Sequence, residues 1–176
     1  MVFIKERKMK RIAKFSKVSY ERYECDYIDT YGSKEGAKEV YEQIKLPLRA
    51  TKGSAGYDFF APRAFTLAPG ETIKIPTGIR VRIDEGWVLK IYPRSGLGFK
   101  YRVQLNNTVG IIDSDYYYST NEGHIFVKMT NAGDKTLSLQ AGDGFSQGIF
   151  IEYGITEDDD VDTVRDGGFG STSAKK

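Results

Sequence analysis

The chain has 176 residues, enough for one domain with a full hydrophobic core and a short appended segment. Its 26 basic and 24 acidic residues nearly balance, so the composition gives no reason to expect a nucleic-acid or membrane partner. One cysteine, Cys25, excludes an internal disulfide and is typical of a reducing compartment. We find neither an apolar run of transmembrane length nor a signal peptide, and we expect a cytoplasmic protein.

The first predicted element is a helix that ends before Pro47. Four of its apolar residues recur at helical spacing: Ala37, Val40, Tyr41 and Ile44. Ser33 is the expected N-cap. We treat residues 1–43 as a partly helical N-terminal extension, in which no residue suggests a role at a functional site.

From residue 44 onward, short alternating runs replace the helical pattern, and almost no helical periodicity remains. Apolar residues of one parity form two such runs: Ile73, Ile75, Ile79, Val81 and Ile83, then Ile125, Val127 and Met129. Turn-like breaks such as APGE, DEGW and QAGDG separate the runs. Several short strands at this spacing predict an all-β, jelly-roll-like sandwich or barrel over residues 44–160.

The last stretch, EDDDVDTVRDGGFGSTSAKK (157–176), is acidic and then glycine-rich, with little to bury, and we expect residues 161–176 to form a mobile tail. Its stretch RDGGFGSTS also suits a second interpretation. Backbone N–H groups of a glycine-rich loop can wrap an anion, with Arg165 adding charge and Phe169 stacking on a flat ligand such as a base. The stretch is not a P-loop, because GxxxxGK[ST] is absent.

An acidic pair stands in GIIDSDYYYS, residues 110–119. In an extended chain Asp113 and Asp115 would share one face. A carboxylate beside buried isoleucines is costly unless it is paired or used. We therefore expect a chemical role for one of the two.

Three other stretches carry weaker signals: AGYDFFA (55–61), PRSGLG (93–98) and GDGFSQG (142–148). The first offers an acid, Asp58, and the third offers an amide donor, Gln147. The second offers Arg94 as a forked donor beside Ser95, although an ordinary turn explains it better when it is taken alone. His124 has no ligand partners at metal spacing, so we assign it a surface or packing role.

Taken in order, AGYDFFA, PRSGLG, GIIDSDYY, GDGFSQGIF and RDGGFGSTS resemble the first to fifth motifs of the trimeric dUTPase family. The resemblance covers roughly residues 44–173, and five ordered motifs make it specific. It implies hydrolysis of dUTP to dUMP and pyrophosphate, with Mg²⁺ on the triphosphate. It also implies a homotrimer with shared active sites, which keeps uracil out of DNA and supplies dUMP for dTMP synthesis.

For the third motif, the resemblance implies that Asp113 activates the water that attacks the α-phosphate, and it gives Asp115 no chemistry. Tyr116 matches the tyrosine whose ring packs on the deoxyribose and excludes a 2′-hydroxyl. Four residues match the hairpin whose main chain pairs with uracil: Asn107, Gly110, Ile111 and Ile112.

The remaining motifs match the parts of the family site that bind phosphates and metal. The second-motif residues that bind phosphate correspond to Arg94, Ser95 and Gly96. Gln147 corresponds to the glutamine near the α-phosphate, and Asp58 to the aspartate that contacts Mg²⁺ through water. In the tail, Phe169 would stack on uracil. Four other tail residues would close over the β and γ phosphates: Arg165, Gly170, Ser171 and Thr172.

The chain departs from the family pattern in three places. Tyr117, Tyr118 and an insertion, STNE, stand where the third motif continues with Arg-Gly, so the hairpin must be supported differently. Gly144 stands where the fourth motif usually has an arginine. Val164 holds a frequent arginine position of the fifth motif, and Arg165 lies one residue closer to the aromatic.

Two alternatives stay open. One is a dCTP deaminase, which uses the same fold but relies on a glutamate and releases ammonia. The other is a dUTPase-fold protein with an added regulatory role, whose partner would contact the N-terminal helix and residues 117–122. An intact Asp113, Tyr116 and tail favour retained dUTP hydrolysis.

Overall fold

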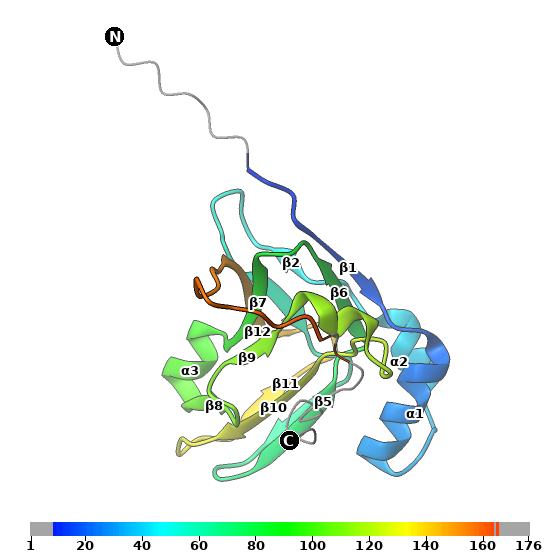
Figure 1. Ribbon diagram of the computed structural model, residues 1–176. Coiled ribbons are helices and arrows are strands. Elements are labelled where there is room, and N and C mark those ends of the chain that lie inside the picture. The colour runs from blue at the N-terminus through cyan, green and yellow to red at the C-terminus, as the bar shows by residue number, and fades with distance from the viewer. Residues whose placement is uncertain (1–8, 164, 166–176) are drawn as a thin grey trace.

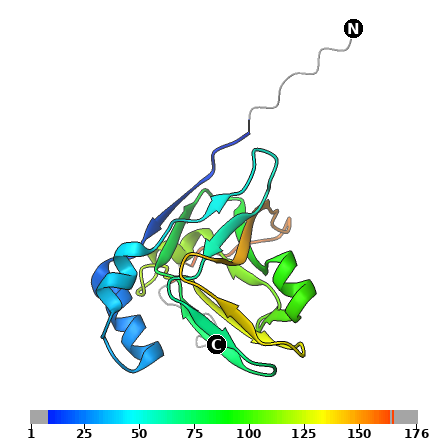
Figure 2. The same ribbon diagram turned by 180° about the vertical axis from the view of Figure 1, so that it is seen from behind.

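The computed structural model describes residues 9–163 and 165, which form a β-rich body with helices at two opposite sides (Figures 1 and 2). The helical segments are α1 (Tyr20–Tyr31), α2 (Ala37–Gln43), α3 (Ser95–Tyr101) and the 3₁₀ helix η1 (Ser114–Tyr118). Helices α1 and α2 lie at one side and α3 at the other. In the described part of the chain, no helix has the length and apolar character needed to cross a membrane.

The strands form antiparallel sheets, and the largest of them positions the site. Its five strands, in spatial order, are β2 (Leu48–Arg49), β3 (Tyr57–Phe60), β12 (Gly144–Glu152), β7 (Trp87–Pro93) and β9 (Gly110–Ile112). A second sheet has the order β5 (Thr72–Pro76), β10 (Phe126–Asn131), β8 (Val103–Leu105). Two pairs complete the fold: β1 (Ala13–Lys17) with β6 (Ile79–Ile83), and β4 (Phe65–Leu67) with β11 (Leu137–Leu139). This architecture confirms the predicted all-β, jelly-roll-like class.

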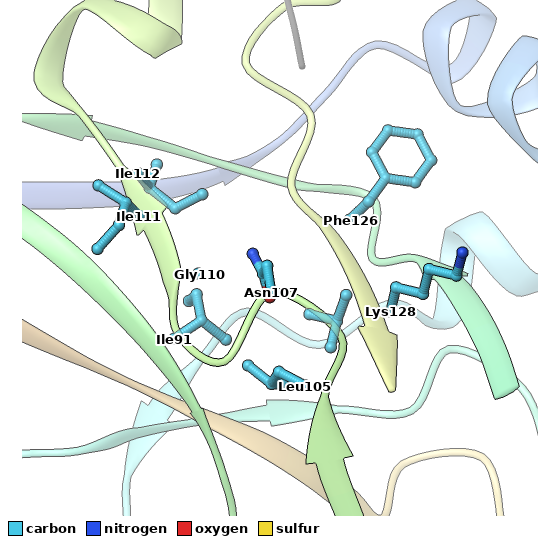
Figure 3. Close-up of a pocket in the computed structure, with 9 residues that line it drawn as sticks. Ile91, Leu105, Asn107, Gly110, Ile111, Ile112, Phe126 and Lys128 are labelled. Atoms are coloured by element: carbon cyan, nitrogen blue, oxygen red, sulfur yellow. The ribbon is translucent and has the colours of Figure 1, made fainter. Parts of the chain in front are cut away.

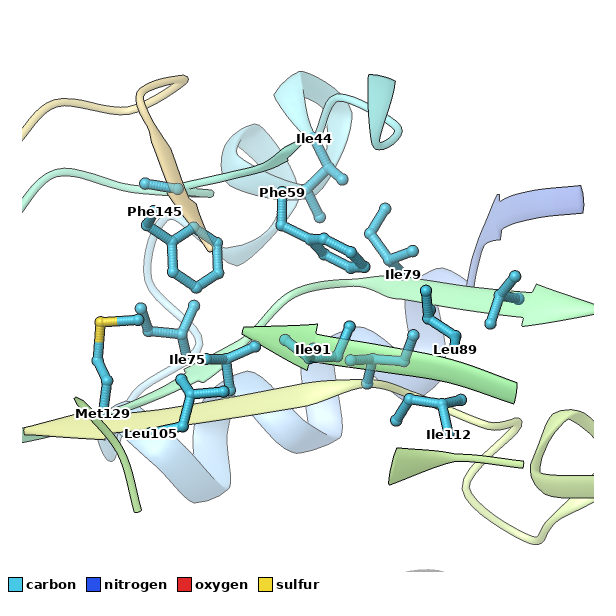
Figure 4. Close-up of a cluster of buried hydrophobic side chains, with 14 of the residues drawn as sticks. Ile44, Phe59, Ile75, Ile79, Leu89, Ile91, Leu105, Ile112, Met129 and Phe145 are labelled. Atoms are coloured by element: carbon cyan, nitrogen blue, oxygen red, sulfur yellow. The ribbon is translucent and has the colours of Figure 1, made fainter. Parts of the chain in front are cut away.

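The hydrophobic core lies between these sheets, and strand alternation builds it. In β6, Ile79, Val81 and Ile83 are buried, while Arg80 and Arg82 lie on the opposite face of the strand, Arg80 half-buried and Arg82 exposed. Figure 4 shows the rings of Phe59 and Phe145 above aliphatic side chains from the neighbouring strands. Burying large apolar side chains at a few kcal/mol each is what holds these short strands together.

Residues before position 44 share this core. Strand β1 pairs with β6 along its whole length, from Ala13 opposite Ile83 to Lys17 opposite Ile79. Helix α1 buries Tyr23 and Tyr27 against the same cluster. The N-terminal extension, as far as it is described, is therefore folded onto the β body.

Two expectations about helices are wrong. Ser33 is not the N-cap of the predicted helix: its hydroxyl accepts from the Glu35 N–H, and Gly36, at φ +76°, caps α2. PRSGLG is not an ordinary turn, because it begins α3 with Arg94 as the N-cap, and η1 follows β9. Two glycines within α3 weaken the helical signal of that stretch.

Helix α1 is joined to the STNE insertion through Ser19 and Glu122. Ser19 is the N-cap of α1, and both its N–H and its hydroxyl donate to the Glu122 carboxylate, at 2.8 and 2.6 Å. A helix N-terminus favours a negative charge. Burial alone would raise the pKa of Glu122, but the bonds from Ser19 and the charges of Arg80 and Arg22 lower it below its ordinary value.

A second connection runs through His124, which is fully buried. Its Nε2 accepts the Gly78 N–H at 2.8 Å, so the ring proton lies on Nδ1, which donates to Asp26 of α1 at 2.6 Å. Arg22 holds the same carboxylate with two hydrogen bonds. Burial lowers the pKa of His124, so the ring is neutral near neutral pH and has a packing role.

We expect Gly78→Ala to be strongly destabilising. Gly78 adopts φ +71°, and a Cβ there would collide with Ile44 and approach the Tyr23 ring at 3.3 Å. Gly86 is the matched control, since its φ is +79° but nothing lies within 4 Å of its Cβ position. Gly86→Ala should cost about 1–2 kcal/mol of strain, and Gly78→Ala about 1–3 kcal/mol more. Equal losses in chemical denaturation would contradict this packing.

We also expect acid to destabilise the protein through His124. An unfolded histidine titrates near 6.5, and burial lowers the folded-state pKa. As pH falls below the unfolded-state value of about 6.5, the unfolded chain binds a proton that the folded chain does not. The free energy of unfolding then decreases by up to about 1.4 kcal/mol per pH unit. The pKa values of Asp26 and Glu122 are lowered too, so they act in the same direction at lower pH. Melting temperatures from about pH 7.5 to about pH 5.5 should fall less steeply for His124→Gln; parallel curves would contradict the assignment.

Candidate active site

The turn that joins β8 to β9 encloses a small pocket (Figure 3). All four residues expected around uracil line it: Asn107, Gly110, Ile111 and Ile112. The expected paired hairpin is absent, however, because β8 pairs with β10 and β9 pairs with β7. The turn therefore connects two sheets, and residues of both sheets line the pocket.

The acidic pair follows β9 directly. Asp113 is the N-cap of η1 and Asp115 lies in its first turn, so the chain is not extended here as expected. Both carboxylates nevertheless reach one guanidinium: Arg165 Nη2 is 2.6 Å from Asp113, and its Nε donates to Asp115 at 3.1 Å. The Asp113 side chain is 46% exposed, which leaves it accessible to water.

Tyr116 lies beside this pair with its hydroxyl turned into the protein. The hydroxyl donates to the His124 carbonyl at 2.7 Å and accepts from Asn121 at 2.8 Å. Burial raises the pKa of Tyr116, against a smaller opposing effect of the Asn121 hydrogen bond, so the hydroxyl keeps its proton. Arg165 lies 5.8 Å from the ring centroid. The ring, and not the hydroxyl, is thus the part of Tyr116 that can face a ligand.

A second cluster collects residues from the first, second and fourth motifs. Arg94 Nε lies 3.2 Å from the Asp58 carboxylate, and Gln147 donates to the Pro93 carbonyl at 3.1 Å. Strands β3, β12 and β7 are neighbours in the five-stranded sheet, so these residues meet although they are far apart in sequence. Ser95 and Gly96 form the first turn of α3 beside them.

Arg94 also lies against the glycine of the fourth motif. Its Nη1 donates to the Gly144 carbonyl at 3.2 Å, and a Cβ at Gly144 would collide with the guanidinium. The space beside residue 144 is therefore already filled by an arginine from the second motif. A positive charge is present here in spite of the missing fourth-motif arginine.

The two clusters lie at opposite ends of the β7–β9 ladder. Ile112 pairs with Leu89 and Gly110 with Ile91, so Asp113 leaves the ladder near Val88, whereas Arg94 follows its other end. At a rise of about 3.4 Å per residue, roughly 20 Å separate Arg94 from Asp113. The pocket lies between them, so a ligand that extends from the pocket toward Asp113 moves away from Arg94 of the same chain.

Some of the predicted residues lie outside the part of the chain that the structure describes: Phe169, Gly170, Ser171 and Thr172. Sequence reasoning assigned no site role to Asn121, His124 or Asp26, although all three support Tyr116 directly or through one neighbour. The only hint was a lone histidine just before an alternating strand. Across the described residues, no group of three or more His, Cys, Asp or Glu side chains could hold a metal ion.

Comparison with known proteins agrees with this arrangement. The dUTPase family model matches residues 42–173. Deoxyuridine 5'-triphosphate nucleotidohydrolase of Lactococcus lactis is 41% identical over 134 residues, which are 74% of this chain and 89% of that protein.

Solved structures give the same result. A dUTPase from Streptococcus mutans superposes with a TM-score of 0.58 at 38% identity, covering 66% of this chain and 91% of that one. A mutant dUTPase from phage phi11 of S. aureus, in which a structural Mg(II) ion is coordinated, has a TM-score of 0.56 at 23% identity, covering 69% and 92%, and so supports the fold alone. The motifs, the architecture and the family match agree: the chain belongs to the dUTPase family.

Proposed function

We propose that the chain hydrolyses dUTP to dUMP and pyrophosphate, with Asp113 as the general base. The observation that carries this proposal is the position of Asp113, partly exposed at the end of β9 and next to the pocket that the β8–β9 turn encloses. A base held there can take the proton of a water molecule that attacks the α-phosphate of a nucleotide bound in the pocket. A cytoplasmic enzyme of this kind removes dUTP and supplies dUMP.

The pocket is suited to read uracil through its own polar groups. Figure 3 shows the Asn107 side chain beside Gly110, with the strand that carries Phe126 and Lys128 on the other side. Main-chain N–H and C=O groups of the turn and of β9 would pair with the base. A site built on hydrogen bonds rejects the wrong base strongly, because its own buried groups would be left unpaired. The Tyr116 ring would pack on the deoxyribose and leave no space for a 2′-hydroxyl.

The cluster at the other end of the ladder is suited to bind phosphates. Arg94 offers a forked donor, and Ser95 and Gly96 offer a hydroxyl and backbone N–H groups. Gln147 adds an amide near the α-phosphate. In the tail, Phe169 would stack on the base, and Arg165, Gly170, Ser171 and Thr172 would close over the β and γ phosphates.

Mg²⁺ fits this donor set only as an ion carried by the substrate. Asp58 is the carboxylate available near Arg94, and the described residues offer no group of three ligands. Mg²⁺ commonly keeps several waters and binds phosphate oxygens, with few protein ligands. When bound, it would orient the triphosphate and neutralise charge as pyrophosphate leaves. Asp58 would hold it through water.

The strand register supports a homotrimer with shared sites. Arg94 and Asp113 of one chain lie roughly 20 Å apart on opposite sides of the pocket. For both to act on one nucleotide, the phosphate cluster must come from a second copy. Closed rotational symmetry among identical copies gives every site the same partners. The tail would come from a third copy, so Arg165, which here binds Asp113 and Asp115 of its own chain, would exchange to another copy in the trimer.

Asp113→Asn should lower kcat by at least about 10²-fold, the usual scale for removing a general base, while nucleotide binding is kept. Asp115→Asn is the matched control, because it removes the other carboxylate that contacts Arg165. It should cost far less activity. Steady-state kinetics and nucleotide binding of both variants check this, and equal losses would show that the carboxylates act only by holding Arg165.

The purified protein should release pyrophosphate from dUTP in a Mg²⁺-dependent reaction. Rates on dCTP, dTTP and UTP should be lower by about 10³-fold or more, because the pocket and the Tyr116 ring exclude them. One assay across the four nucleotides measures this. Ammonia released from dCTP would indicate the deaminase instead, and similar rates on UTP would refute the role of Tyr116.

A further inference from the structure

The loop of residues 119–124 holds Tyr116 in place. The Tyr116 hydroxyl forms hydrogen bonds with Asn121 and with the His124 carbonyl. The main-chain carbonyl of Tyr116 accepts from the Ser119 hydroxyl at 2.7 Å. Three hydrogen bonds therefore tie the side-chain hydroxyl and the main-chain carbonyl of Tyr116 to a single short loop. The position of the Tyr116 ring depends on the position of that loop.

The loop cannot hold this shape by local preference alone. Glu122 adopts φ +57° and Gly123 adopts φ +68°, and the first of these is unfavourable for a residue with a Cβ. Such a conformation persists when the surrounding structure fixes it. Here Arg80 donates to the Tyr117 carbonyl and lies 3.6 Å from the Glu122 carboxylate.

Helix α1 supplies the other two restraints on the loop. Ser19 binds the Glu122 carboxylate with two hydrogen bonds. Asp26 binds the imidazole of His124, and the main-chain carbonyl of His124 accepts the hydrogen bond from the Tyr116 hydroxyl. The imidazole is fully buried, so water does not compete for these contacts. Helix α1 lies before residue 42, outside the part of the chain that the dUTPase family model matches.

We infer that α1 is a positioning element of the active site: Asp26 and Ser19, through His124 and Glu122, hold the Tyr116 ring where it excludes a 2′-hydroxyl. The inference rests on the proposed function, because it takes the Tyr116 ring as the wall beside the sugar. It gives the N-terminal extension a role in substrate discrimination. Neither residue of α1 touches the substrate, so both act through the loop.

Discrimination between dUTP and UTP is the property that a loosened ring affects first. One hydroxyl separates the two substrates, and a displacement of a few tenths of an ångström at the wall makes room for part of it. A catalytic group displaced by about 1 Å can cost about 10²-fold in rate. Loss of support should therefore lower the ratio of kcat/KM for dUTP over UTP by about tenfold, with a smaller loss on dUTP itself.

The test compares Asp26→Ala with Asp29→Ala. Both remove a carboxylate from α1, but Asp29 is exposed and pairs only weakly with Lys74, at 3.2 Å. Asp26→Ala should reduce the dUTP/UTP ratio by about tenfold, and Asp29→Ala should leave it unchanged. Asp26→Asn keeps an acceptor for the His124 Nδ1–H and should restore most of the ratio. Ratios within about twofold of the wild type for a folded Asp26→Ala would overturn the inference.

Glu122→Ala tests the second restraint and keeps the inference testable if Asp26→Ala does not fold. It removes both bonds from Ser19 and should shift the ratio in the same direction; an unchanged ratio in a folded Glu122→Ala protein would overturn the inference. Tyr116→Phe then tests whether α1 acts through the Tyr116 hydroxyl. If α1 acts through the Tyr116 hydroxyl, adding Asp26→Ala to Tyr116→Phe should lower the ratio no further. Fully additive effects would refute this route.

The wild-type protein separates the role of the Tyr116 ring from the role of α1. If it does not prefer dUTP over UTP, and Tyr116→Ala changes nothing, the proposed role of the ring fails. If the wild type discriminates and Tyr116→Ala abolishes discrimination, while the Asp26 and Glu122 variants keep it, only the role of α1 fails.

Discussion

Strand β7 is hydrogen-bonded on both sides, and this double pairing determines where the motifs can lie. Its partner β12 carries the fourth motif and extends the sheet to β3 with the first motif, while β9 on the other side carries the third. The second motif continues from the end of β7 itself. Four motifs therefore lie on one sheet, in an order unrelated to their order in the chain. The pairing also places the acidic pair, Asp113 and Asp115, and the phosphate-binding cluster around Arg94 at opposite ends of the β7–β9 ladder.

Much of the fold follows from short-range pattern. The alternation of Ile79, Val81 and Ile83 is sufficient to predict β6, and the same holds for β10. Helix α1 escaped prediction because its buried face consists of tyrosines, Tyr23 and Tyr27, a residue type that is enriched in strands. Helix α3 escaped because it contains two glycines. These elements form because tertiary packing outweighs weak local propensity.

Only the site residues that lie in the five ordered motifs could be predicted from the sequence. Four residues around the pocket could be named from the sequence because the resemblance to the dUTPase third motif includes them. The contact of Asp26 with His124 joins residues 98 positions apart, and a single sequence carries no local signal for it. The pairing of Arg165 with both carboxylates is equally invisible, because the extended backbone assumed for the acid pair is in fact a 3₁₀ helix. Arg94 beside Gly144 is a third such case, because the two residues are 50 positions apart and meet only across the sheet.

The pairing of β1 with β6 has a consequence for the surface of the molecule. Within the described residues, β1 is the only strand that pairs with β6, so it covers the N–H and C=O groups on that side. A chain that began at the limit of the family match would keep the five motifs but leave β6 as a bare edge with isoleucine and valine at every second position. Such an edge is a template for strands of other molecules. The N-terminal segment therefore also covers this edge, and its loss would leave β6 open to pairing with another molecule.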